Sequence, residues 1–247
     1  MKITTLLFFS LLAFPAFAQY GTPPPPPPPG DNVADIWGER YFHFGLNFTP
    51  GIYWVSPNTS NNTANGASFG YSYGANLEFY FTPNYAFLTG FEIANIGAKY
   101  INANPNPTPS TLDSTITHDE SLQYLQIPLE LKLKTVPFGN VRYYGVVGLD
   151  LGFLLKATDD YNTSVTPFFH PGYTGHVLYS DNNVDISGQT DFFRLSLVIG
   201  LGAEYTLAGS TALQASLVYN NCFTNMNNTS SNAVNIKGIE LMLGVLF

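Results

Sequence analysis

The densest set of potentially reactive residues in this chain is His118-Asp119-Glu120-Ser121. It offers a base, a carboxylate that could orient the base and a hydroxyl, which are the residue types that nucleophilic catalysis uses. Neighbours in an extended segment point to opposite faces, so these residues cannot form a triad among themselves. We therefore expect solvated loop residues here and no catalytic site. A nucleophilic site at His118 and Ser121 is the alternative.

A second set of possible ligands follows in a long polar stretch. Asp159–Asp160, Asp181 and Asp185 carry the oxygen atoms that calcium prefers, but their spacing fits no EF-hand loop. His170 and His176 stand too loosely in a Pro- and Gly-rich stretch to define a metal site. We expect an acidic loop here, with no metal and no cofactor.

Composition narrows the class of protein. The 247 residues are 45% hydrophobic and only 11% charged, which is little charge for a soluble protein. A net charge of -8 with nine basic residues argues against a nucleic-acid partner, because phosphates need a basic surface. No apolar run after the N-terminus reaches the roughly 18 residues of a membrane-spanning helix, which leaves a β-barrel as the way to cross a bilayer. The single cysteine, Cys222, excludes an internal disulfide and a Cys-based zinc site.

The N-terminal residues predict export. Residues 1–18 begin with Lys2, continue through an apolar run and end in Ala16-Phe17-Ala18, the pattern of a signal peptide cleaved near Ala18. Residues 19–39 include seven consecutive prolines, which form an extended rod of roughly 20 Å. We interpret this segment as a periplasmic spacer, with a ligand for a proline-recognising domain as the alternative. The remaining residues, 40–247, form the main domain.

One pattern repeats through the main domain, namely alternation of apolar and polar residues followed by a break. Period-two alternation predicts β-strands. The breaks alternate in length: those at 49–68, 97–120, 156–191 and 221–235 are long, and those between them are short. Long outer loops and short periplasmic turns are typical of outer-membrane barrels. The predicted strands are 40–48, 69–81, 84–96, 121–134, 141–155, 192–205, 211–220 and 236–247.

The fold class that follows is all-β, an eight-stranded antiparallel up-and-down transmembrane β-barrel. The last strand ends on Phe247, and this ending resembles the closing strand of bacterial outer-membrane barrels, whose terminal aromatic residue is part of the signal for the assembly machinery. The localisation that we expect is the outer membrane of a Gram-negative bacterium.

Glycine indicates which face of the strands is inside. A solvated outer surface gains nothing from glycine, whereas the interior of an eight-stranded barrel needs small residues beside large ones. Nine glycines in the predicted strands share the polar face, which is therefore the interior. They are Gly70, Gly74, Gly90, Gly148, Gly152, Gly200, Gly202, Gly238 and Gly244.

The polar face also carries charge. Buried charges must be paired, and eight strands leave no aqueous channel, so we expect an ion-pair network that plugs the lumen. A proton path or gated pore is the alternative. The network is predicted to contain Glu78, Glu92, Glu130, Lys132, Arg142, Asp150, Arg194, Glu204 and Glu240, with His43 and Lys134 near the ends.

A motif in the fourth predicted strand resembles a known family. Residues 124–132 read YLQIPLELK, which is similar to the Tyr-Leu-x-Ile-Pro-Leu-x-x-Lys pattern of the PorT-like outer-membrane β-barrel family of Bacteroidota. Pro128 makes the likeness more specific, because proline is unusual inside a strand. The resemblance covers roughly 40–247 and includes Gly90-Phe91-Glu92. It implies an outer-membrane location and a barrel of about eight strands; one namesake takes part in protein secretion, and most members have no assigned activity.

Together these observations favour an outer-membrane barrel with a structural or surface-interaction role and no catalysis. The expected partners are outer-membrane lipid, the barrel-assembly machinery and an envelope or surface protein. The alternatives are an accessory subunit of an envelope secretion or assembly complex, a small outer-membrane enzyme acting on lipid A or peptides, and a narrow channel.

The two faces of the last strand predict different effects of substitution. Deletion of Phe247 is expected to impair membrane assembly, because it removes the terminal aromatic residue. Glu240→Gln is expected to leave assembly intact and to alter only the interior network. Recovery of the heat-modifiable form in outer-membrane fractions measures both, and normal assembly without Phe247 would contradict the assignment.

Overall fold

The computed structural model describes residues 42–59, 61–104, 112–167, 176–227 and 233–247. The predicted signal peptide, the predicted spacer and the first residues of the first predicted strand lie outside these ranges. Every described residue belongs to one compact unit within residues 34–247. None of the described segments is a helix with the length and apolar character that crossing a bilayer requires.

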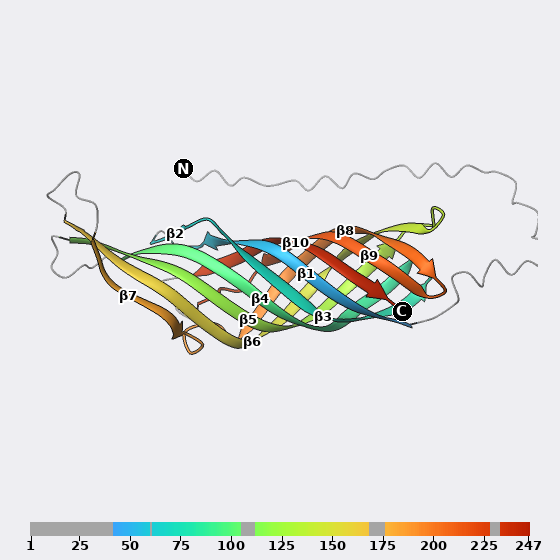
Figure 1. The fold of residues 1–247 in the computed structure, drawn as a ribbon, viewed down its shortest axis with the longest axis horizontal. Helices are drawn as coiled ribbons and strands as arrows, with labels where there is room; N and C mark the ends of the chain where they lie inside the picture. Colours follow the sequence, from blue (N-terminus) through green and yellow to red (C-terminus); the bar gives the residue numbers. More distant parts are fainter. Residues whose placement is uncertain (1–41, 60, 105–111, 168–175, 228–232) are drawn as a thin grey trace, which may run out of the picture. The chain divides into compact units, whose positions relative to one another are not determined.

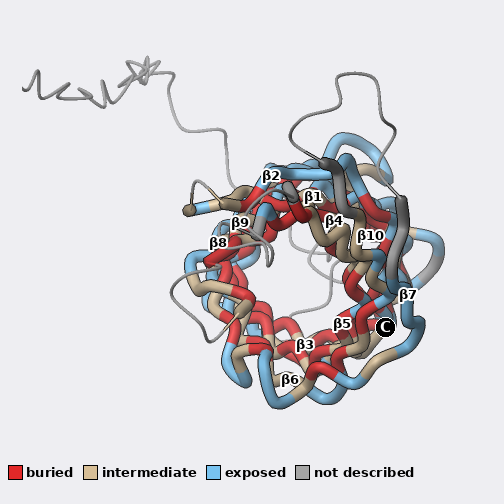
Figure 2. The backbone as a smooth tube through the Cα atoms, turned by 90° about the vertical axis from the view of Figure 1, so that its left-hand side faces the viewer, coloured by how far each residue is buried: buried red, intermediate tan, exposed pale blue. Residues whose placement is uncertain are grey.

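Eight strands form a closed antiparallel barrel (Figures 1 and 2). Each pairs with its neighbours in the chain, and pairing of the first with the last completes the ring. This arrangement confirms the predicted eight-stranded fold. The strands are β1 (Phe42–Pro57), β3 (Ala67–Thr82), β4 (Tyr85–Asn104), β5 (Leu112–Lys134), β6 (Val141–Pro167), β8 (Phe193–Ala208), β9 (Thr211–Cys222) and β10 (Val234–Leu246).

Two further strands extend the wall at one end. β2 (Asn62–Ala64) pairs with β4, and β7 (His176–Asp185) pairs with the distal part of β6. Both lie toward the end of the barrel opposite the C-terminus (Figure 1). They fall inside the predicted long breaks at 49–68 and 156–191, so the prediction of unpaired loops there was wrong.

The strands are also longer than the alternation predicted. β4 and β5 remain paired to Asn104 and Ser114, although 97–120 was predicted to be a break. The outward residues of β5 explain why: they are leucine or isoleucine from Leu133 to Leu125 and then become Gln123 and Ser121. Beyond the apolar band the outward residues meet water and are polar, so the apolar pattern on the outer face disappears while the ladder of backbone hydrogen bonds continues.

At the end of the barrel where the C-terminus lies, short turns join the strands, as predicted. Pro83 and Asn84 join β3 to β4, and the side-chain amide of Asn84 donates a hydrogen bond of 3.1 Å to the Lys134 carbonyl. Gly209, with φ of 59°, joins β8 to β9 in a conformation that glycine adopts readily. Phe247 and Phe44 exchange backbone hydrogen bonds of 2.8 and 3.4 Å, so the C-terminus and the start of β1 share this end.

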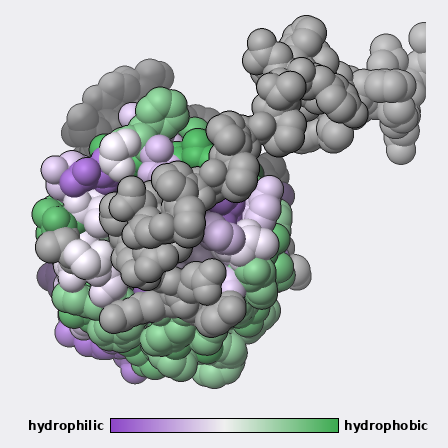
Figure 3. Space-filling model, turned by 90° about the vertical axis from the view of Figure 1, so that its right-hand side faces the viewer, coloured by the Kyte–Doolittle hydropathy of each residue, from purple (hydrophilic) through white to green (hydrophobic). Residues whose placement is uncertain are grey.

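The apolar face points outward and the polar face inward. In β5, Leu129, Leu131 and Leu133 are 37%, 48% and 44% exposed, whereas the intervening Lys132 is 0% exposed. Figure 3 shows the hydrophobic side chains on the flank of the barrel. This burial confirms the assignment of faces made from glycine.

Glycines admit large side chains to the interior. The ring of Tyr53 is 1% exposed and lies over Gly70 and Gly238. A Cβ atom on either glycine would stand 2.6 or 2.5 Å from a ring carbon, well inside van der Waals contact. Gly74 has a different role, because a Cβ there would lie 2.1 Å from the Phe91 carbonyl oxygen of the adjacent strand. Small residues thus let one buried tyrosine fill the width of a narrow barrel.

Gly238→Val is expected to destabilise the barrel, because its added atoms overlap the Tyr53 ring. Overpacking costs roughly 1–3 kcal/mol, and more where the backbone must move. Urea unfolding in detergent, followed by heat-modifiable gel mobility, measures the change. Ala215→Val adds methyl groups on the exposed outer face and serves as the control. Equal stability of the two variants would contradict the packing.

Candidate functional site

The interior carries its charged side chains in distinct groups, and the first lies near the short turns. Lys132 Nζ lies 2.5 Å from Glu78 Oε1 and 2.5 Å from Glu204 Oε1. It also donates a hydrogen bond of 2.9 Å to Gln214. Lys134 Nζ lies 2.9 Å from the same Glu204 oxygen. The group is a compact network of two cations and two carboxylates that excludes solvent.

A second group lies further along the interior and is mainly acidic. Asn47 and Ser72 donate hydrogen bonds of 2.5 and 3.0 Å to the two oxygens of Glu92. Tyr53 donates its hydroxyl to Glu240 at 3.0 Å. These carboxylates are therefore held by neutral donors, unlike the ion pairs near the turns.

Arg194 belongs to this second group. Its guanidinium donates a hydrogen bond of 2.9 Å to Asn220, which in turn donates one of 3.3 Å to Asp150. Asp150 lies diagonal to Glu130 across the β5–β6 ladder, on the same face. The structure thus brings these predicted network residues into one layer.

The remaining predicted residues lie at the short-turn end. Arg142 Nη1 donates a hydrogen bond of 3.4 Å to the Pro83 carbonyl. His43 makes an edge contact with the Tyr80 ring, with centroids 5.0 Å apart. Both positions agree with their location near the ends of strands in the sequence.

An apolar layer lies beyond the charged groups, toward the long loops. Ile186 and Met226 join it from connections between strands rather than from the wall. Large buried aromatic and aliphatic side chains supply the rest. They are Tyr53, Val55, Ile96, Tyr100, Leu122, Tyr124, Val234 and Ile236.

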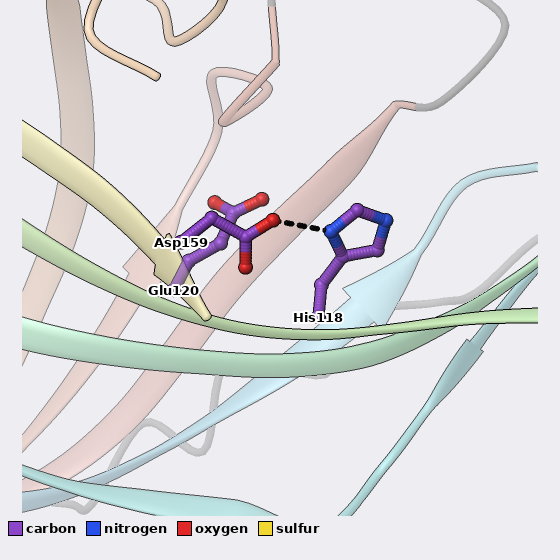
Figure 4. Close-up of side chains that lie close together, drawn as sticks. All are labelled: His118, Glu120 and Asp159. Atoms are coloured by element: carbon purple, nitrogen blue, oxygen red, sulfur yellow. Dashed lines mark hydrogen bonds and ion pairs between the residues drawn. The ribbon is translucent and has the colours of Figure 1, made fainter. Parts of the chain in front are cut away.

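A cluster of three ionisable side chains lies at the outer edge of this layer: His118 and Glu120 of β5 and Asp159 of β6 (Figure 4). One ligand atom from each lies within 4.8 Å of the others. His118 Nδ1 is 2.6 Å from Asp159 Oδ2. Tyr100 donates its hydroxyl to Glu120 Oε1 at 2.6 Å and stacks its ring on the His118 imidazole, with centroids 4.7 Å apart.

The cluster lies outside the apolar band, because the outward residues of β5 turn polar at Gln123. Glu120 is nevertheless buried, at 3% exposed. Burial raises the pKa of Glu120 to about 7, and the Asp159 carboxylate adds to the increase, while the hydrogen bond from Tyr100 opposes it. Its carboxyl group can therefore exchange a proton near neutral pH.

A bulge in β6 creates the cluster. The register of β6 against β5 shifts by one between Tyr124↔Leu154 and Gln123↔Lys156. The shift reverses the faces of the following residues, so Asp159 turns inward opposite Glu120 and Asp160 turns outward. Without the extra residue, Asp160 would have faced the interior instead.

The structure separates the residues of the predicted catalytic alternative. Ser121 is exposed on the outer face, and Asp119 is on that face too, where it pairs with Lys99 at 2.9 Å. His118 points inward, so the triad arrangement does not form. Sequence reasoning placed His118 and Asp159 in two different candidate sets and omitted Tyr100. The β4–β5 register sets Tyr100 opposite His118, so knowledge of that register could have identified Tyr100 as part of the cluster.

The aspartates of the predicted calcium set do not converge. Asp160 accepts a backbone hydrogen bond from Asn183 at 2.6 Å, and Asp185 accepts one from Ser187 at 2.9 Å. The Asp181 carboxylate likewise accepts a backbone hydrogen bond from Asn182 at 2.9 Å. The contacts of Asp181 and Asp185 are local turn contacts, and that of Asp160 links β6 to β7. His170 and the side chain of His176 lie outside the described residues.

A pocket of about 730 Å³ is lined by residues of β1, β8, β9 and β10 and by Val141 of β6. Exposed apolar side chains contribute to it, among them Leu46, Leu213 and Leu243. Its lining also includes Asn47, Glu204 and Gln214, whose side chains are buried in the interior.

Residues 17–170 match the family model described as outer membrane protein beta-barrel domain. The chain belongs to this family. Membership agrees with the closed eight-stranded barrel and indicates the outer membrane of a Gram-negative cell. A search of curated proteins gave no match.

The similar solved structures include the following three. Neisserial surface protein A is 15% identical, with 82% of this chain and 95% of that chain covered and a TM-score of 0.41. Outer membrane protein OprG from Pseudomonas aeruginosa is 11% identical, with 86% and 98% covered and a TM-score of 0.40. Ail, the attachment invasion locus protein of Yersinia pestis, is 11% identical, with 84% and 100% covered and a TM-score of 0.32. At these identities and TM-scores the likenesses carry no argument about function.

Lys132→Met is expected to cost about 3–5 kcal/mol of unfolding free energy, because it leaves the carboxylates of Glu78 and Glu204 buried beside a single remaining lysine. Urea titration in detergent micelles measures the loss. Adding Glu78→Gln to the same protein is expected to recover part of it. Lys99→Met breaks an exposed ion pair and is the control, with an expected change of at most about 1 kcal/mol. A similar loss in both single variants would disprove the special role of the buried pair.

Proposed function

We propose that this protein is an outer-membrane barrel with a plugged lumen, which acts as a structural or surface-interaction protein and not as an enzyme. The observation that carries the proposal is the burial of interior side chains in successive layers. Charged, acidic and apolar layers follow one another from the short turns to the long loops. An eight-stranded barrel has room for such side chains and for little else.

The innermost contacts support a static plug rather than a transport path. Lys132 is completely buried between two carboxylates, and the predicted network residues Glu92 and Glu240 are held by neutral donors. Beyond them Leu122 and Tyr124 are 1% and 2% exposed in the apolar layer. A water path would have to displace packed hydrocarbon as well as break paired charges.

The outer part of the barrel supports a role at the cell surface. β5 and β6 remain paired far beyond the apolar band, and β7 broadens this wall. Its outward side chains include Asp119, Ser121 and Asp160, which are polar and accessible. This polar outer face of paired strands outside the bilayer is a suitable surface for an envelope or surface protein partner.

The finer parts of the assignment rest on sequence. The YLQIPLELK motif at 124–132 supports membership of the PorT-like branch in Bacteroidota, and residues 1–18 support export with cleavage near Ala18. Phe247 is half exposed at the end of the closing strand, where the barrel-assembly machinery could read it. Outer-membrane lipid is the partner that covers the apolar band.

A plugged barrel is expected to be electrically silent. Planar bilayers with the purified protein should show no single-channel steps, whereas Tyr124→Ala combined with Met226→Ala should give openings, because both changes hollow the apolar layer. Tyr219→Ala shortens an exposed outer side chain and is the control that should stay silent. Regular conductance steps from the unaltered protein would show that the lumen is a channel.

A further inference from the structure

The His118–Glu120–Asp159 cluster contains more acceptor atoms than the protein satisfies. Glu120 Oε2 and Asp159 Oδ1 are buried, and neither has a hydrogen-bond partner among the residues that the structure describes. Their side chains are almost fully enclosed, with Glu120 and Asp159 each 3% exposed. A buried carboxylate oxygen without a donor costs free energy that a bound cation would recover.

The donor set defines what kind of cation fits. One imidazole nitrogen and two carboxylates are ligands that zinc and similar divalent transition metals use at about 2.0–2.2 Å, whereas calcium and magnesium prefer oxygen alone. Ligand atoms around a tetrahedral zinc stand roughly 3.3 Å apart. The three ligand atoms already lie within 4.8 Å of one another, so small side-chain rotations would close the site.

The surroundings orient the ligands in the way that metal sites require. Tyr100 restrains the His118 ring by stacking, and its hydroxyl holds Glu120 Oε1 while leaving Oε2 for another partner. Asn227 donates a hydrogen bond of 3.4 Å to the same hydroxyl. Such contacts fix the direction of ligating groups. In Figure 4 the two carboxyl groups lie close together on the Nδ1 side of the imidazole.

We propose that His118, Glu120 and Asp159 bind one divalent transition-metal ion of the zinc class, with water as a further ligand. The side chain of His118 is 20% exposed, so solvent and ions reach the site. The ion connects β5 to β6 where the two strands leave the bilayer. Tyr100 is a positioning residue and not a ligand. The site does not depend on whether the lumen is plugged.

The test uses full-length protein without a histidine tag, purified in detergent and stripped with a chelator. Calorimetric titration with Zn²⁺ should give one strong site, and Co²⁺ should give the intense visible absorption of a four-coordinate ion. His118→Gln, Glu120→Gln and Asp159→Asn should each weaken binding by about 100-fold or more. Tyr100→Phe keeps the ring stacking and loses the hydroxyl, so it should weaken binding by about 10-fold.

The chain supplies matched controls one residue away. Asp119→Asn and Asp160→Asn remove carboxylates from the outer face of the same two strands and should leave affinity and spectrum unchanged. Heat-modifiable mobility shows that each variant is folded. An excess of Ca²⁺ should fail to displace Zn²⁺. Absence of the strong site in the unaltered protein would overturn the proposal, as would equal affinity in the ligand variants and the controls.

Discussion

The whole structure depends on pairing every backbone hydrogen-bonding group that lies within hydrocarbon. An open sheet would leave unpaired edges in the bilayer, so β1 must meet β10 and the sheet must close. Closure of eight strands produces a narrow interior, and the narrowness determines what can lie there. Gly70 and Gly238 make room for Tyr53, and Lys132 can be buried only because Glu78 and Glu204 surround it. The arrangement of the interior is thus a consequence of the bilayer outside.

The fold could be predicted largely because side chains in a strand alternate with a period of two. Leu131 faces the lipid and Lys132, the next residue, faces the interior, so successive residues alternate between apolar and polar. The contrast between an apolar outer face and a polar inner face ends where the bilayer ends. The outer halves of β5 and β6 were therefore not predicted as strands. Thr115, Thr117 and Asp119 face water and carry no apolar pattern, yet their backbone remains paired with β6. Prediction therefore failed where the outer face met water instead of lipid and lost its apolar residues.

The cluster of His118, Glu120 and Asp159 could not be predicted for another reason. Its members belong to two strands, and their meeting depends on a register that a single bulge changes. Leu155 is the extra residue, and it decides whether Asp159 or Asp160 faces the interior. If strict alternation is continued past the bulge, Asp160 is assigned to the interior instead of Asp159. Composition and spacing reveal that ionisable residues are present, but only the ladder shows which of them share a face.

The seam between β1 and β10 has a consequence for how the chain reaches this state. Phe44 and Phe247 exchange hydrogen bonds across it, although they stand at opposite ends of the barrel sequence. Contacts between distant residues form late, because the entropy of closing the intervening loop must be overcome first. During synthesis and export the edge of β1 therefore has no final partner until the last residues emerge. The chain must spend that interval with an unsatisfied strand edge, which is a site where aggregation can begin.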